Sequence, residues 1–231
     1  MKLENKVIVI TGGTKGLGKE LALGFAKLQV QVIVSAHTED GVQNLTENNI
    51  LFVKADSRNE KDIVNLANTV IENYGRIDIW INNAGVFHTF SVDDEFIDME
   101  KAHAIIDTNL FGTIFGCRTA LKVMKKNGTG TIVNILSTAA LDATRAQNAK
   151  IYAASKWAIR GYLQAVEAEN ADSGISFISV YPGGTKTELY GEVKPASFYD
   201  YMEADSVAEK IIANLNNENP EKEQIIKRPS K

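Results

Sequence analysis

The sequence of 231 residues contains a single cysteine, Cys117, and only four prolines. One cysteine excludes an intramolecular disulfide and fits a reducing compartment. No apolar run approaches the roughly 20 residues that a membrane-spanning helix needs. The charged start MKLENK has no apolar segment behind it, so it does not resemble a secretory signal peptide. We therefore expect a cytoplasmic protein.

The sequence also lacks a large excess of charge of one sign, with 25 basic and 29 acidic residues. The net charge is −4 at pH 7 and no strongly basic run stands out, which disfavours a nucleic-acid surface. The three histidines, His37, His88 and His103, lack the spacing of metal ligands, so we expect no metal site. The G-x-S-x-G motif of serine hydrolases is absent. What remains is an ordinary globular composition, with 44% hydrophobic and 23% charged residues.

Short β-branched runs separated by helical patterns are the most abundant feature. The runs are continuously apolar rather than alternating, which is typical of parallel strands covered on both faces. The alternation predicts an α/β fold, a single-domain Rossmann-like doubly wound parallel sheet of about seven strands with helices on both faces, over residues 1–231. The expected strands are 7–11, 32–36, 50–56, 77–84, 131–137, 176–181 and 223–227, and the expected helices are 17–28, 63–74, about 96–124, 152–169 and 206–215.

A glycine-rich segment, TGGTKGLG at 11–18, directly follows the first apolar run. Gly12, Gly16 and Gly18 fall between strand and helix, where the backbone turns tightly and a phosphate can approach the helix N-terminus. Two nucleotide-binding interpretations compete, beside a turn that binds nothing. The segment nearly matches a Walker A loop, but Glu20 stands where a hydroxyl would ligate Mg²⁺. The spacing G-x-x-x-G-x-G favours a dinucleotide.

Tyr152 and Lys156, in the segment YAASK, share one face of an expected helix. Residues i and i+4 lie roughly 6 Å apart, close enough for an ammonium group to favour a phenolate. A free tyrosine has a pKa of about 10, and lowering it by about three units corresponds to ~4 kcal/mol. Such a tyrosine could exchange a proton with a carbonyl or alcohol oxygen. On spacing alone, ordinary helix packing is the commoner explanation.

Five motifs occur in order along the chain: TGGTKGLG (11–18), NNAG (82–85), TNLFGT (108–113), YAASK (152–156) and PGGTKT (182–187). Together they resemble the short-chain dehydrogenase/reductase family over essentially the whole length. The resemblance implies an oxidoreductase that transfers hydride between a nicotinamide and a carbonyl or alcohol substrate, with the protein supplying position and protons. A non-catalytic dinucleotide-binding regulatory protein is the alternative, and the intact tyrosine–lysine pair argues against it.

The resemblance also implies a catalytic tetrad. Tyr152 matches the acid/base of the family's Y-x-x-x-K motif, and Lys156 matches its partner. Ser137 closes the fifth strand, where the family has its substrate-binding serine, and Asn109 matches the helix asparagine that anchors a water on the proton relay. The sequence departs from the pattern because a leucine replaces the first of two frequent serines and the stretch up to the tyrosine is about two residues longer. Thr138 is therefore the fallback for Ser137.

A cofactor site follows from the same resemblance. Asp56 matches the family's adenine-contacting acid, although it would equally suit a helix N-cap. Asn83 and its two neighbours would border the adenine ribose, although Asn83 also suits a role in tying the sheet together. The turn 182–187 would position the nicotinamide. The complete expected set is Gly12, Thr14, Lys15, Gly16, Leu17, Gly18, Ser35, His37, Asp56, Asn83, Ala84, Gly85, Tyr152, Lys156, Pro182, Gly183, Thr185 and Thr187.

The end of the second strand bears on which nicotinamide is used. An NAD enzyme of this fold places an acid there to bind the ribose 2′-hydroxyl, but this strand has Ala36 at about that position. Lys15 occupies the position where NADP-dependent relatives keep a basic residue. With Ser35 and His37 it is expected to hold the 2′-phosphate, which predicts NADP(H) and a bias toward reduction. In the alternative, Lys15 is solvated and an acid of the segment TED (38–40) meets the ribose.

Three segments are expected to form the walls of the substrate site: Phe87 and His88, the segment 138–151, and a substrate loop at about 188–202. That loop contains four aromatic residues, Tyr190, Phe198, Tyr199 and Tyr201, which favour an aromatic or otherwise apolar carbonyl compound. Packing of the rings within a short lid would explain them as well.

Self-association is also expected. The helices at about 99–124 and 152–169 carry small and apolar residues beyond what one core-facing stripe requires. Relatives in the family pair the same two helices across a two-fold axis. The sequence therefore predicts a homo-tetramer or homo-dimer that acts on a small molecule.

Overall fold

The computed structural model describes residues 2–91, 95–146, 148–191, 194–195 and 197–228. A seven-stranded sheet with the order β3-β2-β1-β4-β5-β6-β9 runs through the middle, and all its neighbouring strands are parallel. The predicted fold class is confirmed. The strands are β1 (Val7–Thr11), β2 (Gln31–Ala36), β3 (Leu51–Lys54), β4 (Ile79–Asn82), β5 (Gly130–Ile135), β6 (Ile175–Pro182) and β9 (Glu223–Ile226).

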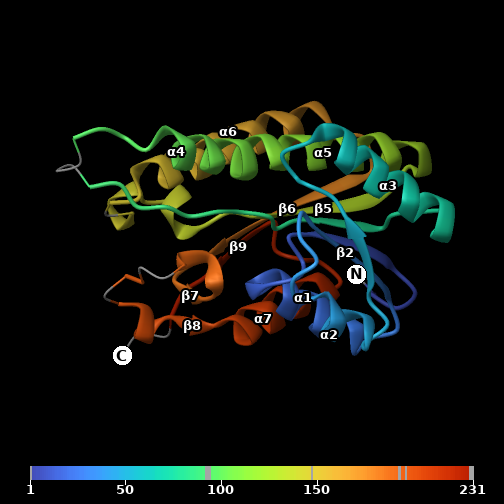
Figure 1. Cartoon of the computed structure of the whole chain (residues 1–231). Helices are drawn as coiled ribbons and strands as arrows, with labels where there is room; N and C mark the ends of the chain where they lie inside the picture. Colours follow the sequence, from blue (N-terminus) through green and yellow to red (C-terminus); the bar gives the residue numbers. More distant parts are fainter. Residues whose placement is uncertain (1, 92–94, 147, 192–193, 196, 229–231) are drawn as a thin grey trace.

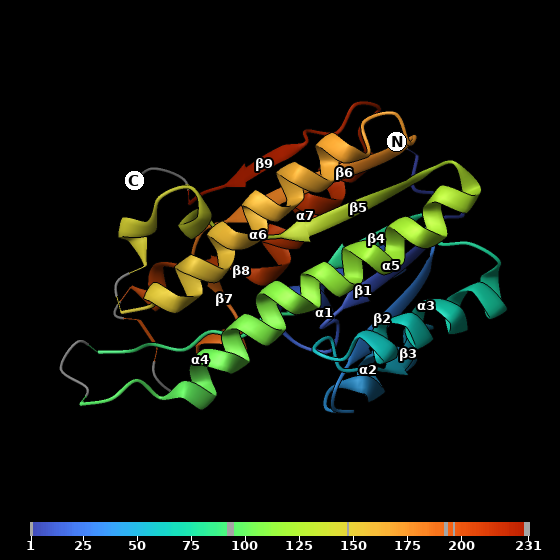
Figure 2. The ribbon, with the colours of Figure 1, turned by 90° about the horizontal axis from the view of Figure 1, so that it is seen from above.

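Helices cover both faces of the sheet (Figure 1). One face carries α1 (Gly16–Ala26), α2 (Val42–Thr46) and α7 (Ala204–Asn216). The other face carries α3 (Glu60–Tyr74), α4 (Met99–Ile105), α5 (Gly112–Asn127) and α6 (Lys150–Glu169). Each layer buries its own apolar core against the sheet, which explains why the strands are apolar on both sides. Seen from above, α5 and α6 run side by side over β4, β5 and β6 (Figure 2).

The long helix expected at about 96–124 is divided. It begins at Met99, after the N-cap Asp98, whose side chain accepts a hydrogen bond from the Lys101 backbone N–H. Between α4 and α5 the chain forms a π-helical segment, η1 (Ile106–Phe111). Such segments arise where one extra residue is inserted into a helix, and they are frequent at functional sites.

Three expected strands are shorter at their carboxyl ends than the apolar runs. The runs at 50–56, 77–84 and 131–137 become β3, β4 and β5, which end two residues early. The chain leaves the sheet at these points and forms the loops on its carboxyl edge. The strand order reverses between β1 and β4. In open α/β sheets, ligands bind outside the carboxyl ends of the strands at such a reversal, so this edge is where a ligand is expected.

Several short elements, including α2, were not predicted from the sequence. The others are the paired strands β7 (Thr185–Lys186) and β8 (Met202–Glu203), and the short helices η2 (Thr138–Ala140), η3 (Ala143–Arg145), η4 (Glu188–Tyr190) and η5 (Phe198–Asp200). Within the described ranges, no helix is both long and apolar enough to cross a bilayer.

Candidate active site

The four expected catalytic residues come from three elements of the carboxyl edge. Ser137 directly follows β5 and caps η2, where its hydroxyl oxygen accepts a hydrogen bond from the Ala139 N–H at 3.1 Å. Tyr152 and Lys156 lie in the first turns of α6, and Tyr152 shares a hydrogen bond with Ser137. Ser137, rather than the fallback Thr138, is therefore the hydroxyl next to Tyr152.

The Lys156 side chain extends from α6 to the end of β5. Its ammonium nitrogen donates a hydrogen bond to the Ile135 carbonyl oxygen at 3.0 Å and lies 5.6 Å from the centroid of the Tyr152 ring. The side chain is buried, with 5% of its surface exposed. A buried cation is thus held beside the phenol by the end of β5.

Burial controls the acidity of both groups. Burial raises the pKa of the Tyr152 hydroxyl to about 12, against the opposing hydrogen bond with Ser137. Burial lowers the pKa of Lys156 to about 8. The direction for Tyr152 is opposite to the lowering expected from the spacing, because the cost of desolvating a phenolate exceeds the effect of the groups around it. At pH 7 the protein groups therefore keep Tyr152 as a neutral phenol and Lys156 mainly as a cation.

Asn109 lies in the π-helical segment and is fully buried. Its amide clamps the backbone of Val86, accepting from the N–H at 2.8 Å and donating to the carbonyl oxygen at 3.0 Å. The same amide nitrogen donates to the Ser155 hydroxyl at 3.2 Å. These bonds join the segment after β4 to α6, so Asn109 positions the elements around Tyr152. Its expected role as a water anchor stays a prediction.

The glycine-rich turn is held against the end of β4 by Asn83. The Asn83 amide nitrogen donates to the carbonyl oxygens of Thr11 (3.0 Å) and Gly12 (2.9 Å). Gly12 has a φ of +63°, and a Cβ there would lie 2.8 Å from the Ala84 Cα. A Cβ on Gly18 would collide with the Gly12 carbonyl oxygen. The sheet-tying role anticipated for Asn83 is thus present, while its contact with a ribose stays a prediction.

The two loops expected to hold the cofactor meet at the start of α1. Gly16 has a φ of +51°, and a Cβ there would lie 3.0 Å from the Thr187 Cβ. The first turn of α1, which is described in full, carries no acidic residue, and Lys15 forms no side-chain cap there. The Glu188 carboxylate also lies near this point, with its Oε2 atom 3.4 Å from a Cβ built on Gly16. A helix N-terminus framed by glycines nevertheless fits a pyrophosphate group, because its backbone N–H groups are directed at the ligand. The residues present therefore fit a dinucleotide.

The other expected cofactor residues surround this point. Thr14 and Ser35 are buried, His37 is exposed, and Leu17 packs against the core beneath α1. Gly85 borders the Asn109 amide oxygen. Pro182 ends β6, the Gly183 N–H donates to Ile226, and the Thr185 hydroxyl donates to the Gly183 carbonyl oxygen at 3.0 Å.

Asp56 lies just past β3 and is paired with Arg58. The closest contact, 2.6 Å, joins the Arg58 Nη2 to the Asp56 Oδ2, and the Arg58 side-chain hydrogen bonds hold the pKa of this carboxyl below its ordinary value. Asp56 does not cap α3, so that alternative was wrong. The N-cap is Asn59, whose side chain accepts from the Lys61 N–H at 3.0 Å. An asparagine just before an acidic first turn was a signal that could have identified this cap.

Lys15 is not a lone cation. Its ammonium group forms an ion pair with Asp40, with 3.0 Å between the nitrogen and the Oδ2 atom. Asp40 also accepts a hydrogen bond from the Thr38 hydroxyl at 3.2 Å. The neighbouring Glu39 lies 3.8 Å from Lys54. The acids after β2 therefore face cations from two other parts of the chain.

A chain of aromatic contacts leads away from Tyr152 on the expected substrate side. The ring of Phe87 meets those of Tyr152 and Tyr190 edge to face, each with 5.1 Å between centroids. Tyr190 in turn contacts Phe198 (5.7 Å) and Tyr201 (5.5 Å). Burial raises the pKa of the Tyr190 hydroxyl. Residues 192–193 and 196 of the expected substrate loop lie outside the described residues.

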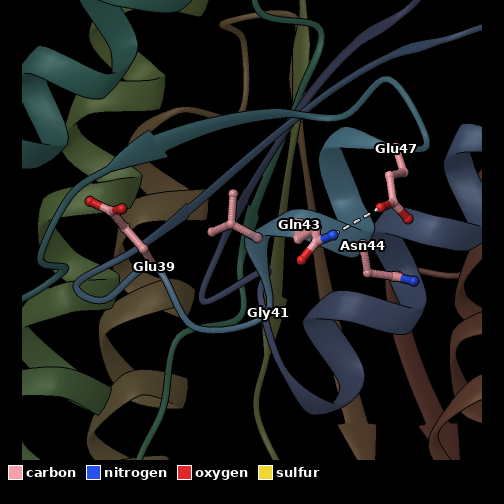
Figure 3. A pocket seen from close by; sticks show the side chains of 6 residues that line it. Glu39, Gly41, Gln43, Asn44 and Glu47 are labelled. Carbon is pink, nitrogen blue, oxygen red and sulfur yellow. Dashed lines mark hydrogen bonds between the residues drawn. The ribbon is translucent and has the colours of Figure 1, made fainter.

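A separate hollow of ≈ 460 Å³ lies at the start of α2 (Figure 3). Two of its lining residues, Glu39 and Glu47, are carboxylates, and the Gln43 amide donates to Glu47 at 3.3 Å. None of the expected catalytic or cofactor residues lines it. We assign no ligand to this hollow.

Three comparisons place the chain among known proteins. The family model for short chain dehydrogenases matches residues 6–197. An oxidoreductase of Bacillus subtilis (strain 168), the uncharacterized YxnA, is 31% identical over 229 residues, which cover 91% of this chain and 63% of that protein. The chain thus spans less than two thirds of the length of this relative.

Two solved structures extend the comparison. ElxO with NADP bound is 30% identical, with a TM-score of 0.84 over 96% of this chain and 97% of that one. The 3-ketoacyl-(acyl-carrier-protein) reductase from Brucella melitensis, complexed with NADH, is 25% identical, with a TM-score of 0.87 over 97% of this chain and 98% of that one. Both forms of nicotinamide dinucleotide thus occur among proteins that share this fold.

Proposed function

The chain belongs to the short-chain dehydrogenase/reductase family and is an oxidoreductase of that family, and we propose that it is an NADP(H)-dependent reductase of ketones, diketones or aldehydes. The observation that carries the proposal is the arrangement of Tyr152, which is hydrogen-bonded to Ser137 and lies beside the buried ammonium group of Lys156. A phenol, a hydroxyl and a cation on one edge of the sheet are the groups that protonation of a carbonyl oxygen requires.

NADPH, when bound, supplies the hydride for the carbonyl carbon. Tyr152 acts as general acid and donates its phenolic proton to the carbonyl oxygen. Its pKa of about 12 keeps it protonated at neutral pH, so the proton that the carbonyl oxygen takes up is in place before the reaction. The Ser137 hydroxyl turns from Tyr152 to the same carbonyl oxygen and stabilises its developing charge. The ammonium group of Lys156 stabilises the phenolate left behind.

Three observations support NADP(H) as the cofactor. The relative ElxO, 30% identical to this chain, was solved with NADP bound. The second strand ends at Ala36, so no acid stands there to bind a 2′-hydroxyl. Lys15 lies at the glycine turn and carries a positive charge suited to a 2′-phosphate. We expect kcat/KM for NADPH to exceed that for NADH by at least about tenfold, because one charge-assisted bond contributes roughly 1.5–3 kcal/mol.

The substrate proposed is an aromatic or otherwise apolar carbonyl compound. The ring of Phe87 contacts those of Tyr152 and Tyr190, and Val86 and Ile151 belong to the same small apolar cluster as Tyr152. A pocket of this kind binds through apolar contact and orients its ligand through a few polar groups. A screen of diketones, quinones, aldehydes and ketosteroids, followed through NADPH absorbance, would identify the substrate.

Tyr152→Phe tests the proposal directly. This change removes the proton donor but keeps the ring that packs against Phe87. We expect carbonyl reduction to fall by about 10²–10⁴-fold, with cofactor affinity within about twofold of the unmodified value. Tyr74→Phe is the matched control, because Tyr74 ends α3, outside every segment expected to contact cofactor or substrate, and should tolerate the loss of its hydroxyl.

Turnover by Tyr152→Phe near that of the unmodified protein would refute the catalytic assignment. If the unmodified protein binds NADPH but reduces no carbonyl compound in the screen, the alternative of a dinucleotide-binding regulatory protein is favoured instead.

We also propose that the protein acts in the cytoplasm as a homo-dimer or homo-tetramer. The face formed by α5 and α6 exposes Trp157 (44%), and Phe111 at the end of the π-helical segment is 43% exposed. Phe111 stacks on Phe115, with ring centroids 6.2 Å apart. An apolar face of this kind suits a second copy related by two-fold symmetry.

A further inference from the structure

The loop after β2 is fixed against the glycine-rich turn by close backbone contacts. The Gly13 N–H donates to the Ser35 carbonyl oxygen at 3.1 Å. Gly41 has a φ of +81°, and a Cβ there would lie only 2.6 Å from the Thr14 carbonyl oxygen. Only glycine adopts this conformation without strain. Asp40, the residue before Gly41, is therefore held beside Lys15 by the fold.

The charge of Lys15 is already engaged in this arrangement. One Asp40 oxygen, Oδ2, lies 3.0 Å from the Lys15 nitrogen and 3.2 Å from the Thr38 hydroxyl oxygen. The hydrogen bond from Lys15 is the largest of the effects that lower the pKa of Asp40. Both side chains are largely exposed, 53% for Lys15 and 66% for Asp40. Solvent screens such a pair, so an incoming anion can compete for the lysine.

We propose that Asp40 is a specificity-determining residue that reduces the preference for NADP(H) over NAD(H) by competing with the 2′-phosphate for Lys15. The inference rests on the proposed function, since it concerns the ribose end of the cofactor site. A 2′-phosphate that reaches Lys15 must replace the carboxylate and then remain near its negative charge, and both effects oppose binding. A 2′-hydroxyl carries no charge, so Asp40 does not oppose NAD(H) in this way.

Glu39 is the natural comparison for Asp40. It is the adjacent acid in the same loop, but it faces Lys54 from β3 at 3.8 Å rather than the glycine-rich turn. If only the overall negative charge of the loop opposed the 2′-phosphate, neutralising Glu39 and neutralising Asp40 would have similar effects on NADP⁺ binding. If the opposition comes from competition for Lys15, only the change at Asp40 has this effect.

Calorimetric titration with NADP⁺ and NAD⁺ tests this inference without depending on turnover. Asp40→Asn should tighten NADP⁺ binding by about five- to tenfold, since an exposed ion pair and a nearby like charge are both removed, and should change NAD⁺ binding less than about twofold. The gain should shrink at 0.5 M salt, because salt screens exposed charges. Glu39→Gln should change NADP⁺ binding by less than about twofold.

The double variant Lys15→Ala/Asp40→Asn decides the mechanism. If Asp40 acts through Lys15, most of the gain from Asp40→Asn should vanish in the Lys15→Ala background. An equal gain without Lys15, an equal gain from Glu39→Gln, or no gain from Asp40→Asn would overturn the inference. If neither dinucleotide binds the unmodified protein or any variant, the proposed function itself fails. If both bind and Asp40→Asn changes nothing, only the role of Asp40 fails.

Discussion

Replacing Gly116 by alanine should destabilise the protein, although alanine is the better helix former. Gly116 lies within α5 and faces the end of β4. A Cβ at this position would overlap the Asn82 Oδ1 atom and lie 2.9 Å from the Trp80 Nε1 atom. Asn82 would have to leave its place, and it sits in a buried polar network beneath the helix.

The network sets the magnitude of the effect. The Asn82 Oδ1 atom accepts from the Trp80 indole N–H at 2.8 Å, and its Nδ2 atom donates to the Asn134 Oδ1 at 2.8 Å. All three side chains are buried, so each broken bond leaves a desolvated polar group that costs about 1–3 kcal/mol. Alanine offsets roughly 1 kcal/mol of this through its helix propensity. The free energy of unfolding should therefore fall by about 1–5 kcal/mol.

Urea unfolding followed by far-ultraviolet circular dichroism measures this change. Gly161→Ala is the matched control, because Gly161 is an exposed glycine within α6 and a Cβ there meets no atom within 4 Å. It should raise the free energy of unfolding by about 0.5–1 kcal/mol. Light scattering on each variant shows whether its self-association has changed, so that such a change is not mistaken for a change in the free energy of unfolding. A Gly116→Ala protein as stable as the unmodified one would refute the argument from the network.

Two further predictions follow from the site and from the exposed face. Burial lowers the pKa of Lys156 from 10.5 to about 8. Between these two pH values the unfolded chain therefore binds more protons than the folded protein does. The free energy of unfolding should then rise with pH, by up to roughly 1 kcal/mol per pH unit. The raised pKa values of Cys117 and Tyr152 act in the opposite direction above about pH 9. The test therefore compares the free energy of unfolding as a function of pH in the unmodified protein and in Lys156→Met, which should lack the rise. Identical pH profiles of the two proteins would contradict the prediction. Light scattering at micromolar concentration should give a dimer or tetramer, and Trp157→Glu should shift it toward the monomer; a monomeric unmodified protein would argue against self-association.

Local pattern was sufficient for the fold. The apolar run at 7–11 became β1 without change, and the other runs became strands with ends shifted by one or two residues. Helical periodicity found α1, α3, α6 and α7, since these elements depend on neighbours within a few positions. The glycines between β1 and α1 likewise predicted the tight turn, because a turn also depends on residues within a few positions. The π-helical segment was not predicted, because one extra residue inserted into a helix changes the apolar periodicity of the sequence too little to be recognised.

Properties that depend on distant parts of the chain were decided only by the tertiary structure. The spacing of Tyr152 and Lys156 predicted a lowered tyrosine pKa, whereas burial by other elements raises it to about 12. The sequence placed Lys15 at the glycine turn, but its partner Asp40 lies 25 positions away. Desolvation and charge pairing sum over every element that packs around a group. No local pattern of residues contains that sum.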